Sequence, residues 1–427
     1  MYVNDGSKDK TWSIINEIAE KEELFTGITL SRNRGHQNAL LGGLMTAKKY
    51  ADVVISMDAD LQDDINAMKE MIKKYSEGIY IGEYNMKQKK RNSSIELLRI
   101  IAMLMIIVLH FVGPYTNLDK SIKNYYLIQF VESISIIGVN IFVIISAYFL
   151  METKKVKLRK IINLISCIVF YGLLFFILAV ILKIKPFDKL ELLYAVIPFL
   201  AGRRWFVLSY ITLYLISPYL SFILNKISKK SYRNLILISL IFCSIWPTFL
   251  PGGLRLDNGY GIISFIQLFI ITGYIKRFHN QTNSKKMNYL IVCIASQLII
   301  FLLSIIRVTD TYWNYNNLFN ITSSIALFQV FNKIEIDNKI INKLSSYSFS
   351  VYLIHTDFML SVYVYENIMN RATVITSNYL IIYILVYALL TYAICSLIDI
   401  IRKFVFKHTL DKIFDKIKWF NKELECK

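Results

Sequence analysis

The sequence has few charged residues and few prolines, and its cysteines are isolated. Only 19% of its 427 residues are charged, against about 25% in a typical soluble protein. Six prolines and 55% hydrophobic residues exclude collagen-like and disordered chains. The cysteines have neither metal-ligand nor redox-motif spacing, so we expect small buried side chains at Cys167, Cys243, Cys293, Cys395 and Cys426. The sequence therefore predicts an integral membrane protein.

Positive charge is unevenly distributed along the chain. Residues 1–83 carry a net charge of −4, whereas residues 84–427 carry +22. This basic excess lies between long apolar runs, which favours membrane topology signals over nucleic-acid binding. The first 90 residues contain no apolar run of the length that a signal peptide needs, so the first such run is expected to remain as a membrane span. We expect an acidic soluble head at 1–83, a basic linker at 84–94, a transmembrane domain at 95–402 and a basic tail at 403–427.

Ten apolar stretches are candidates to cross a hydrocarbon layer about 30 Å thick. They are 95–114, 131–150, 161–182, 205–224, 234–250, 261–275, 288–306, 315–331, 344–365 and 379–401; the fifth, sixth and eighth are short or polar. With the N-terminus inside, the inner loops hold 20 Lys and Arg and the outer loops hold 10. This asymmetry predicts a multi-pass helical protein with both termini cytoplasmic. The Lys- and Ile-rich composition predicts that the membrane is a bacterial inner (plasma) membrane.

The C-terminal tail has apolar residues at helical spacing over about 407–424, with lysines between them. This pattern predicts an amphipathic helix. It would lie either on the inner leaflet of the bilayer or against the protein itself.

Within the first span, the most informative ionisable pair is Arg99 and His110. Eleven helical residues make three turns plus roughly 20°, so both side chains lie on one face, about 16 Å apart along the axis. Glu96, one turn before Arg99, is placed to orient it. Ionisable groups in a span are functional candidates. The alternatives are that Arg99 reaches the lipid phosphates and that a neighbouring helix satisfies a neutral His110.

The segment Ile95–Arg99 and His110 resemble the opening helix of the membrane-bound acyltransferase family 3, whose signature is an Arg and a His with ten residues between them. Further similar segments follow in the family's order at Gly138–Leu150, Trp205–Pro218 and Ser348–His355. In the segment Gly138–Leu150, which resembles the family's second helix, Ala147 stands where the family usually has Gly. The likeness covers about 93–402, and ten spans with both ends inside fit it.

This resemblance implies an enzyme that transfers an acyl group, usually acetyl from cytoplasmic acetyl-CoA, to a hydroxyl of a carbohydrate or lipid-linked glycan. His110 matches the family's proposed catalytic histidine, and an imidazole can take a proton from a sugar hydroxyl or carry the acyl group itself. Arg99 matches the paired arginine, which is suited to holding a CoA phosphate or polarising the thioester carbonyl.

The resemblance extends to weaker candidates. Lys157 and Arg159 lie in a loop partly similar to the family's basic motif, so they either bind acyl-CoA or set topology. Trp205 would stack on a sugar ring or anchor the helix at the interface. His355 would bind substrate or make a structural hydrogen bond to a neighbouring helix.

The head has alternating short strands and helices, with helices at about 10–22, 36–50 and 64–76 and strands ending near Val3 and over 27–30 and 52–57. This order predicts a partial parallel α/β sheet. Carboxylates directly after a strand occupy the ligand-binding edge of such a sheet. A solvated turn with a helix cap is the alternative reading of this acidic cluster, whose members include Asp58 and Asp60.

Three motifs resemble family 2 glycosyltransferases that load sugars onto polyprenyl phosphate: Val3–Asp9, Asn33–Leu44 and Asp58–Asp63. The likeness covers about residues 1–80. It implies that Asp5 contacts the nucleotide base and that Asp58 and Asp60 bind Mg²⁺ or Mn²⁺ with the diphosphate. The family's first strand and acceptor-binding part have no counterpart here, so we expect a truncated GT-A-like fragment without glycosyl transfer. Weak nucleotide-sugar binding or docking is the alternative for the head.

Two other functions remain open for the whole chain. One is an active polyprenyl-phosphate glycosyltransferase using a nucleotide sugar. The other is a non-enzymatic transport or assembly protein with the same spans, in which His110 would be dispensable.

Overall fold

The computed structural model describes residues 1–7, 9–57, 72, 75, 92–117, 119–153, 155–197, 199, 202–250, 257–279, 285–306 and 310–425. The chain forms two compact units, Met1–Lys90 and Arg91–Lys427. The boundary between them falls inside the predicted basic linker 84–94.

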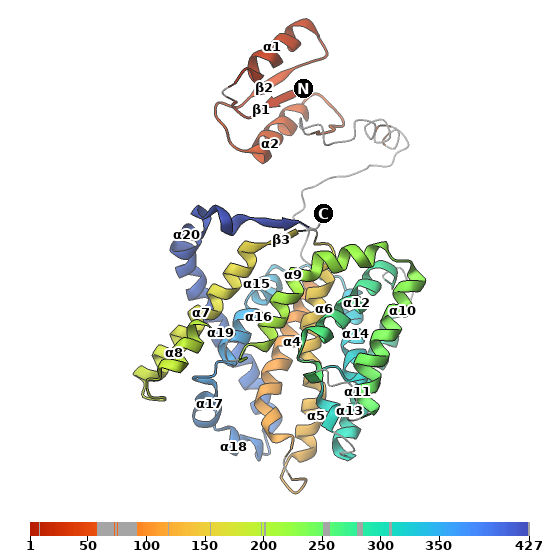
Figure 1. Ribbon diagram of the computed structural model, residues 1–427, viewed down its shortest axis with the longest axis vertical. Helices are drawn as coiled ribbons and strands as arrows, with labels where there is room; N and C mark the ends of the chain where they lie inside the picture. Colours follow the sequence, from red (N-terminus) through yellow and green to blue (C-terminus); the bar gives the residue numbers. More distant parts are fainter. Residues whose placement is uncertain are drawn as a thin grey trace. The chain divides into compact units, whose positions relative to one another are not determined.

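The N-terminal unit contains the expected alternation of strands and helices. Strands β1 (Tyr2–Asn4) and β2 (Gly27–Thr29) pair in parallel, with Val3 opposite Ile28. Between them runs helix α1 (Thr11–Lys21) and after them α2 (His36–Ala47) (Figure 1). Parallel neighbours require such a crossover connection.

The strand predicted at 52–57 is wrong, because these residues are not in a strand. Val53 and Val54 are exposed and their segment pairs with neither described strand. A strand is stable only where a neighbour takes up its backbone hydrogen bonds. Most of the helix predicted at 64–76 lies outside the described residues.

The C-terminal unit is a helical bundle (Figure 1). Its principal elements are α4 (Ser93–Val112), α5 (Tyr125–Ser135), α6 (Gly138–Leu150), α7 (Leu158–Ile181), α8 (Lys189–Val196), α9 (Trp205–Lys226), α10 (Lys229–Leu240), α11 (Trp246–Phe249), α12 (Ile262–Tyr274), α13 (Lys286–Ile306), α14 (Leu318–Asn332), α15 (Lys339–Ser345), α16 (Ser348–His355), α17 (Ser361–Tyr363), α18 (Arg371–Ile375), α19 (Leu380–His408) and α20 (Leu410–Lys416). Strands β3 (Lys155–Lys157) and β4 (Glu423–Glu425) complete it. Figure 1 shows β3 and α20 at one end of this unit and α17 and α18 at the other.

Among the described residues, seven helical segments are long and apolar enough to cross a membrane. They are Ser93–Tyr115, Tyr125–Leu150, Leu158–Ile181, Trp205–Lys226, Lys229–Phe249, Lys286–Ile306 and Leu380–His408. The multi-pass helical class is therefore confirmed, but three of the ten predicted spans are not among these seven.

These three are the segments at 261–275, 315–331 and 344–365, represented by α12, α14 and α16. They have 13, 15 and 8 helical residues, and they contain fully buried polar side chains such as Thr272, Asn320, Ser323 and Ser348. Backbone interrupted at membrane depth is tolerated where other protein segments surround it. These short helices therefore belong to the interior of the bundle.

Helix α4 is central to this unit and packs against α5, α6, α14, α15, α16 and α19. It begins at Ser93, where the Asn92 side chain caps it by accepting a hydrogen bond from the Ser94 amide. Helix α6 approaches it closely at Gly138, because a Cβ there would lie 2.8 Å from the Ala102 carbonyl oxygen. This packing positions Arg99 and His110 of α4 within the bundle.

The tail does not form the single helix predicted at about 407–424. Helix α20 ends at Lys416, a 3₁₀ turn spans Lys418–Asn421, and β4 pairs antiparallel with β3. Arg159 contacts Asp411, and its guanidinium lies 4.9 Å from the centre of the Phe414 ring. The tail therefore packs against the protein, which was one of the two expected arrangements.

Candidate active site

His110 and His355 form a hydrogen-bonded pair between α4 and α16. His110 Nδ1 lies 3.1 Å from His355 Nε2, and His355 Nδ1 lies 2.6 Å from the Val351 carbonyl oxygen. A carbonyl only accepts, so His355 Nδ1 carries the proton in the neutral ring and its Nε2 accepts from His110. His110 Nε2 is then left with a lone pair, as a base requires.

His110 lines a cavity of about 400 Å³. Nine of its 21 lining residues are Phe, Tyr or Trp, and they include Trp205, Phe206, Tyr260, Trp313, Tyr315 and Tyr352. The polar members include His110, Glu132 and Arg203. His355 is not among the lining residues. Its hydrogen bond to His110 connects it to the cavity.

Trp205 begins α9 and lies in the largest aromatic cluster of this wall. Its ring stacks on Tyr315, with centroids 5.8 Å apart and an interplanar angle of 26°, and meets Tyr260 edge-on at 4.6 Å. Trp205 is half-buried and packs within this aromatic part of the cavity wall. Aromatic faces of this kind suit the apolar face of a sugar ring.

An ion pair that was not predicted from the sequence lies next to the wall of the cavity. Arg204 and Asp357 are each about 5% exposed and lie 3.2 Å apart. Arg204 also donates to the Thr356 hydroxyl at 3.1 Å and to the Leu353 carbonyl at 3.3 Å. It thus ties the start of α9 to the end of α16, beside His355. The sequence signal for this ion pair was the Arg203-Arg204 dipeptide, which is unusually basic for the predicted outer loop 183–204.

Arg203, the other member of that dipeptide, lines the cavity and pairs with Glu191. Its two nitrogens donate to the carboxylate at 2.5 and 2.7 Å. These hydrogen bonds hold the pKa of Glu191 below its usual value. The pair therefore stays ionised at neutral pH.

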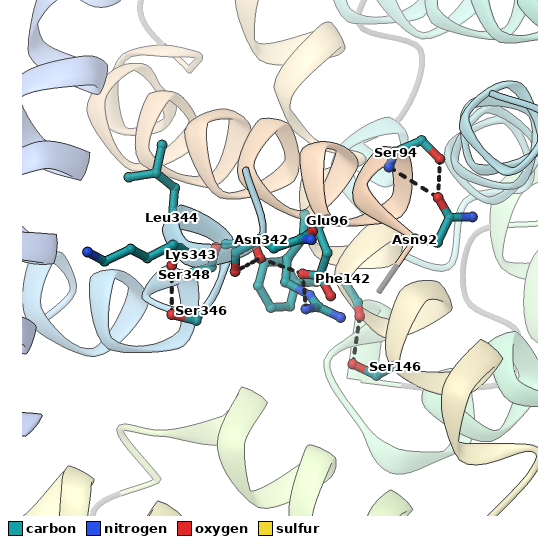
Figure 2. Close-up of polar contacts among 12 residues, drawn as sticks. Asn92, Ser94, Glu96, Phe142, Ser146, Asn342, Lys343, Leu344, Ser346 and Ser348 are labelled. Carbon is teal, nitrogen blue, oxygen red and sulfur yellow. Dashed lines mark hydrogen bonds and ion pairs between the residues drawn. The ribbon is translucent and has the colours of Figure 1, made fainter. Parts of the chain in front are cut away.

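Arg99 lies toward the other end of α4, outside the lining of the cavity. It donates to Glu96 Oε2 at 2.5 Å, and the Ser345 hydroxyl donates to the same oxygen at 2.5 Å. The Ser345 hydroxyl also lies 3.2 Å from the Asn342 carbonyl oxygen of α15, and Figure 2 shows Glu96 and Asn342 among these polar contacts. Glu96 thus orients Arg99, as predicted, and Arg99 is about 16 Å along the helix from His110.

Lys157 and Arg159 contact the C-terminal segment. Lys157 Nζ lies 3.4 Å from Glu423, and Arg159 lies 3.3 Å from Asp411 and 3.0 Å from Asp415. The basic loop therefore has acidic partners in the protein itself. The backbone N–H of Lys157 also donates to the Tyr214 hydroxyl of α9 at 3.0 Å.

In the N-terminal unit, Asp5 accepts a hydrogen bond from the Arg34 amide at 2.7 Å, which joins the two loops that follow β1 and β2. Asp58 and Asp60, the predicted metal-binding residues, lie outside the described residues. Within the described part of the chain, no group of three or more His, Cys, Asp or Glu side chains is placed to hold a metal ion.

Residues 92–400 match the family described as "Acyltransferase domain". The chain belongs to this family. The match covers most of the chain and includes the histidine pair, its cavity and the Arg99 network. The predicted likeness at about 93–402 is confirmed, and the C-terminal unit is a membrane acyltransferase domain.

Residues 1–135 match "Glycosyl transferase family 2", so this match extends past the predicted end near residue 80 and overlaps the acyltransferase match. "Uncharacterized glycosyltransferase YkoT" of Bacillus subtilis is 44% identical over 94 residues, which are 22% of this chain and 28% of that protein. "Bactoprenol glucosyl transferase" of Shigella phage SfV is 42% identical over 78 residues, or 18% and 25% of the two chains. This chain thus spans about a quarter of the length of these relatives. No solved structure matches.

Proposed function

We propose that this protein is a membrane O-acyltransferase that moves an acyl group, most simply acetyl, from cytoplasmic acyl-CoA to a hydroxyl of a cell-envelope or surface glycan. The observation that carries the proposal is the histidine pair, which leaves a lone pair on Nε2 of His110, a residue that lines a cavity rich in aromatic side chains. The membrane spans and the family are in accord with this activity.

In the proposed reaction, His110 Nε2 takes the proton of the acceptor hydroxyl as its oxygen attacks the thioester carbonyl. The C–S bond then breaks, the CoA sulfur leaves, and the proton returns from His110 to it. His355 fixes the His110 ring and stabilises its cationic form through the hydrogen bond to Nδ1.

Arg99 is better placed to bind CoA than to act at the reacting carbon. A group about 16 Å from His110 is too far away to polarise the thioester carbonyl that the acceptor hydroxyl attacks beside His110. The Arg99 guanidinium, which Glu96 fixes in place, is suited to binding a phosphate of the nucleotide part of CoA. The extended pantetheine arm would then run from the Arg99 end of the bundle to the cavity, with the Arg99 end cytoplasmic.

Membranes that contain this protein should transfer label from acetyl-CoA into lipid-linked or surface glycan, whereas membranes without it should not. The product would be fractionated and the label released by mild base, as expected of an ester. Protein that is present and inserted but transfers no label from acetyl-CoA or longer acyl-CoAs would contradict the proposal and favour a transport or assembly role.

A chain lacking residues 1–83 should retain most of this acyl transfer. The histidine pair, the cavity and Arg99 all lie within the unit Arg91–Lys427, and the start of α4 is capped by its own Asn92. The same labelled-acetate assay measures this, normalised to inserted protein. Loss of transfer in a correctly inserted truncation would make the head a working part of the enzyme.

A further inference from the structure

Glu132 is a buried carboxylate that the proposed reaction does not yet use. It lies in α5, is 5% exposed and lines the cavity that contains His110. Its Oε2 atom has no hydrogen-bond partner among the described residues. Burying a carboxylate oxygen without a partner is costly, so such a group requires an explanation such as a missing ligand.

Glu132 is close to the catalytic helix. A Cβ built on Gly113 would lie 3.5 Å from Glu132 Oε1 and 3.9 Å from Oε2. Gly113 follows His110 by three residues, at the turn where α4 ends. The carboxylate therefore lies within van der Waals distance of this turn, beside the His110 end of α4.

The surroundings of Glu132 point to a polyhydroxylated ligand. A carboxylate accepts hydrogen bonds and can receive two neighbouring hydroxyls at once. Trp205, Tyr260 and Tyr315 form an aromatic wall of the same cavity. An apolar ring face beside a convergent polar group is the usual composition of a small-molecule site, and a sugar ring presents both kinds of surface.

We infer that Glu132 positions the acceptor sugar. Its carboxylate accepts hydrogen bonds from ring hydroxyls next to the hydroxyl that is acylated, and so presents that hydroxyl to His110 Nε2. Glu132 is a positioning residue, since the proton is transferred at His110. This inference rests on the proposed function and adds the acceptor subsite to it.

The test compares the full-length wild type with Glu132→Gln, which keeps the shape of the side chain but removes its charge and one acceptor oxygen. Lipid-linked glycan extracted from the producing cells, measured by hexose content, serves as acceptor for labelled acetyl-CoA. We expect KM for the glycan to rise by at least about tenfold, the loss typical of one hydrogen bond to a charged group. KM for acetyl-CoA should stay within about twofold of wild type, a change too small for a lost hydrogen bond.

Gln297→Leu is the matched control. Gln297 lies in α13, is 8% exposed, and both of its side-chain polar atoms lack partners among the described residues. It is not part of the cavity lining, so this variant should change neither KM. Equal KM values for glycan in wild type and Glu132→Gln, with normal His110-dependent transfer, would overturn the inference and leave the proposed function intact.

A second measurement needs no turnover. The same glycan should raise the thermal unfolding midpoint of purified wild type, because a ligand that binds the native state stabilises it. At the same glycan concentration the increase for Glu132→Gln should be clearly smaller. If wild type transfers no label, the proposed function fails, and the midpoint shift alone then decides the inference. No shift in wild type, or an equal shift in both proteins, would overturn it.

Discussion

Replacing His110 with alanine should lower acyl transfer by at least about a hundredfold, within the range by which a positioned general base accelerates a reaction. The variant lacks the nitrogen lone pair that the hydrogen bond to His355 leaves on His110, a residue of the cavity lining. The His110 side chain makes its polar contact with His355, so its loss should have little effect on the stability of the fold. Expression and insertion should therefore be unchanged, and initial rates with labelled acetyl-CoA would be normalised to inserted protein.

Two further histidine variants make this result specific. His408→Ala is the control, because His408 is exposed at the end of α19 and contacts Phe404 of its own helix; its activity should equal that of wild type. His355→Ala should fall between the two, because His110 keeps its position but loses the hydrogen bond that selects its tautomer. Full activity of inserted His110→Ala would remove His110 from the mechanism.

The sequence predicted the residues of the first helix better than their partners. The eleven-residue spacing placed Arg99 and His110 on one face, and the position of Glu96 one turn earlier predicted its contact with Arg99. The partner of His110 is His355, 245 residues away in the chain. Helical periodicity reports faces within one helix and says nothing about which distant helix packs there, so this pair required the fold.

Polarity explains why three of the ten predicted spans are not among the seven long apolar helices. Sequence windows detect apolar stretches by their average composition, whereas α14 contains the buried polar residues Asn320, Ser323 and Ser324 and ends at Asn332. Such a helix is surrounded by protein and does not need an apolar lipid-facing length. Averaging over a window also passes over a single carboxylate such as Glu132. A carboxylate near the start of an apolar span is a functional candidate, but only the structure shows that Glu132 lines the cavity that contains His110.

Replacing Asp357 with alanine should be the most destabilising of the substitutions considered, by about 3–5 kcal/mol. Arg204 and Asp357 are both about 95% buried and 3.2 Å apart. Removing the carboxylate leaves the Arg204 charge buried without its counter-ion, although the Thr356 hydroxyl and Leu353 carbonyl still contact it. Thermal unfolding of purified protein, followed by the fraction that remains monodisperse after heating, would report the loss.

The double variant Arg204→Leu with Asp357→Leu should recover much of that stability, because it removes both charges and leaves no unpaired one. Glu191→Gln is the control. It disrupts the neighbouring, partly exposed pair with Arg203, and such pairs contribute at most about 1 kcal/mol. If Asp357→Ala unfolds no earlier than Glu191→Gln, Arg204 is already solvated in the membrane-embedded protein. The Arg204–Asp357 ion pair between α9 and α16 would then not be what positions His355 next to His110. The position of the histidine pair would have to come from the packing of α16 against α4, α7 and α19.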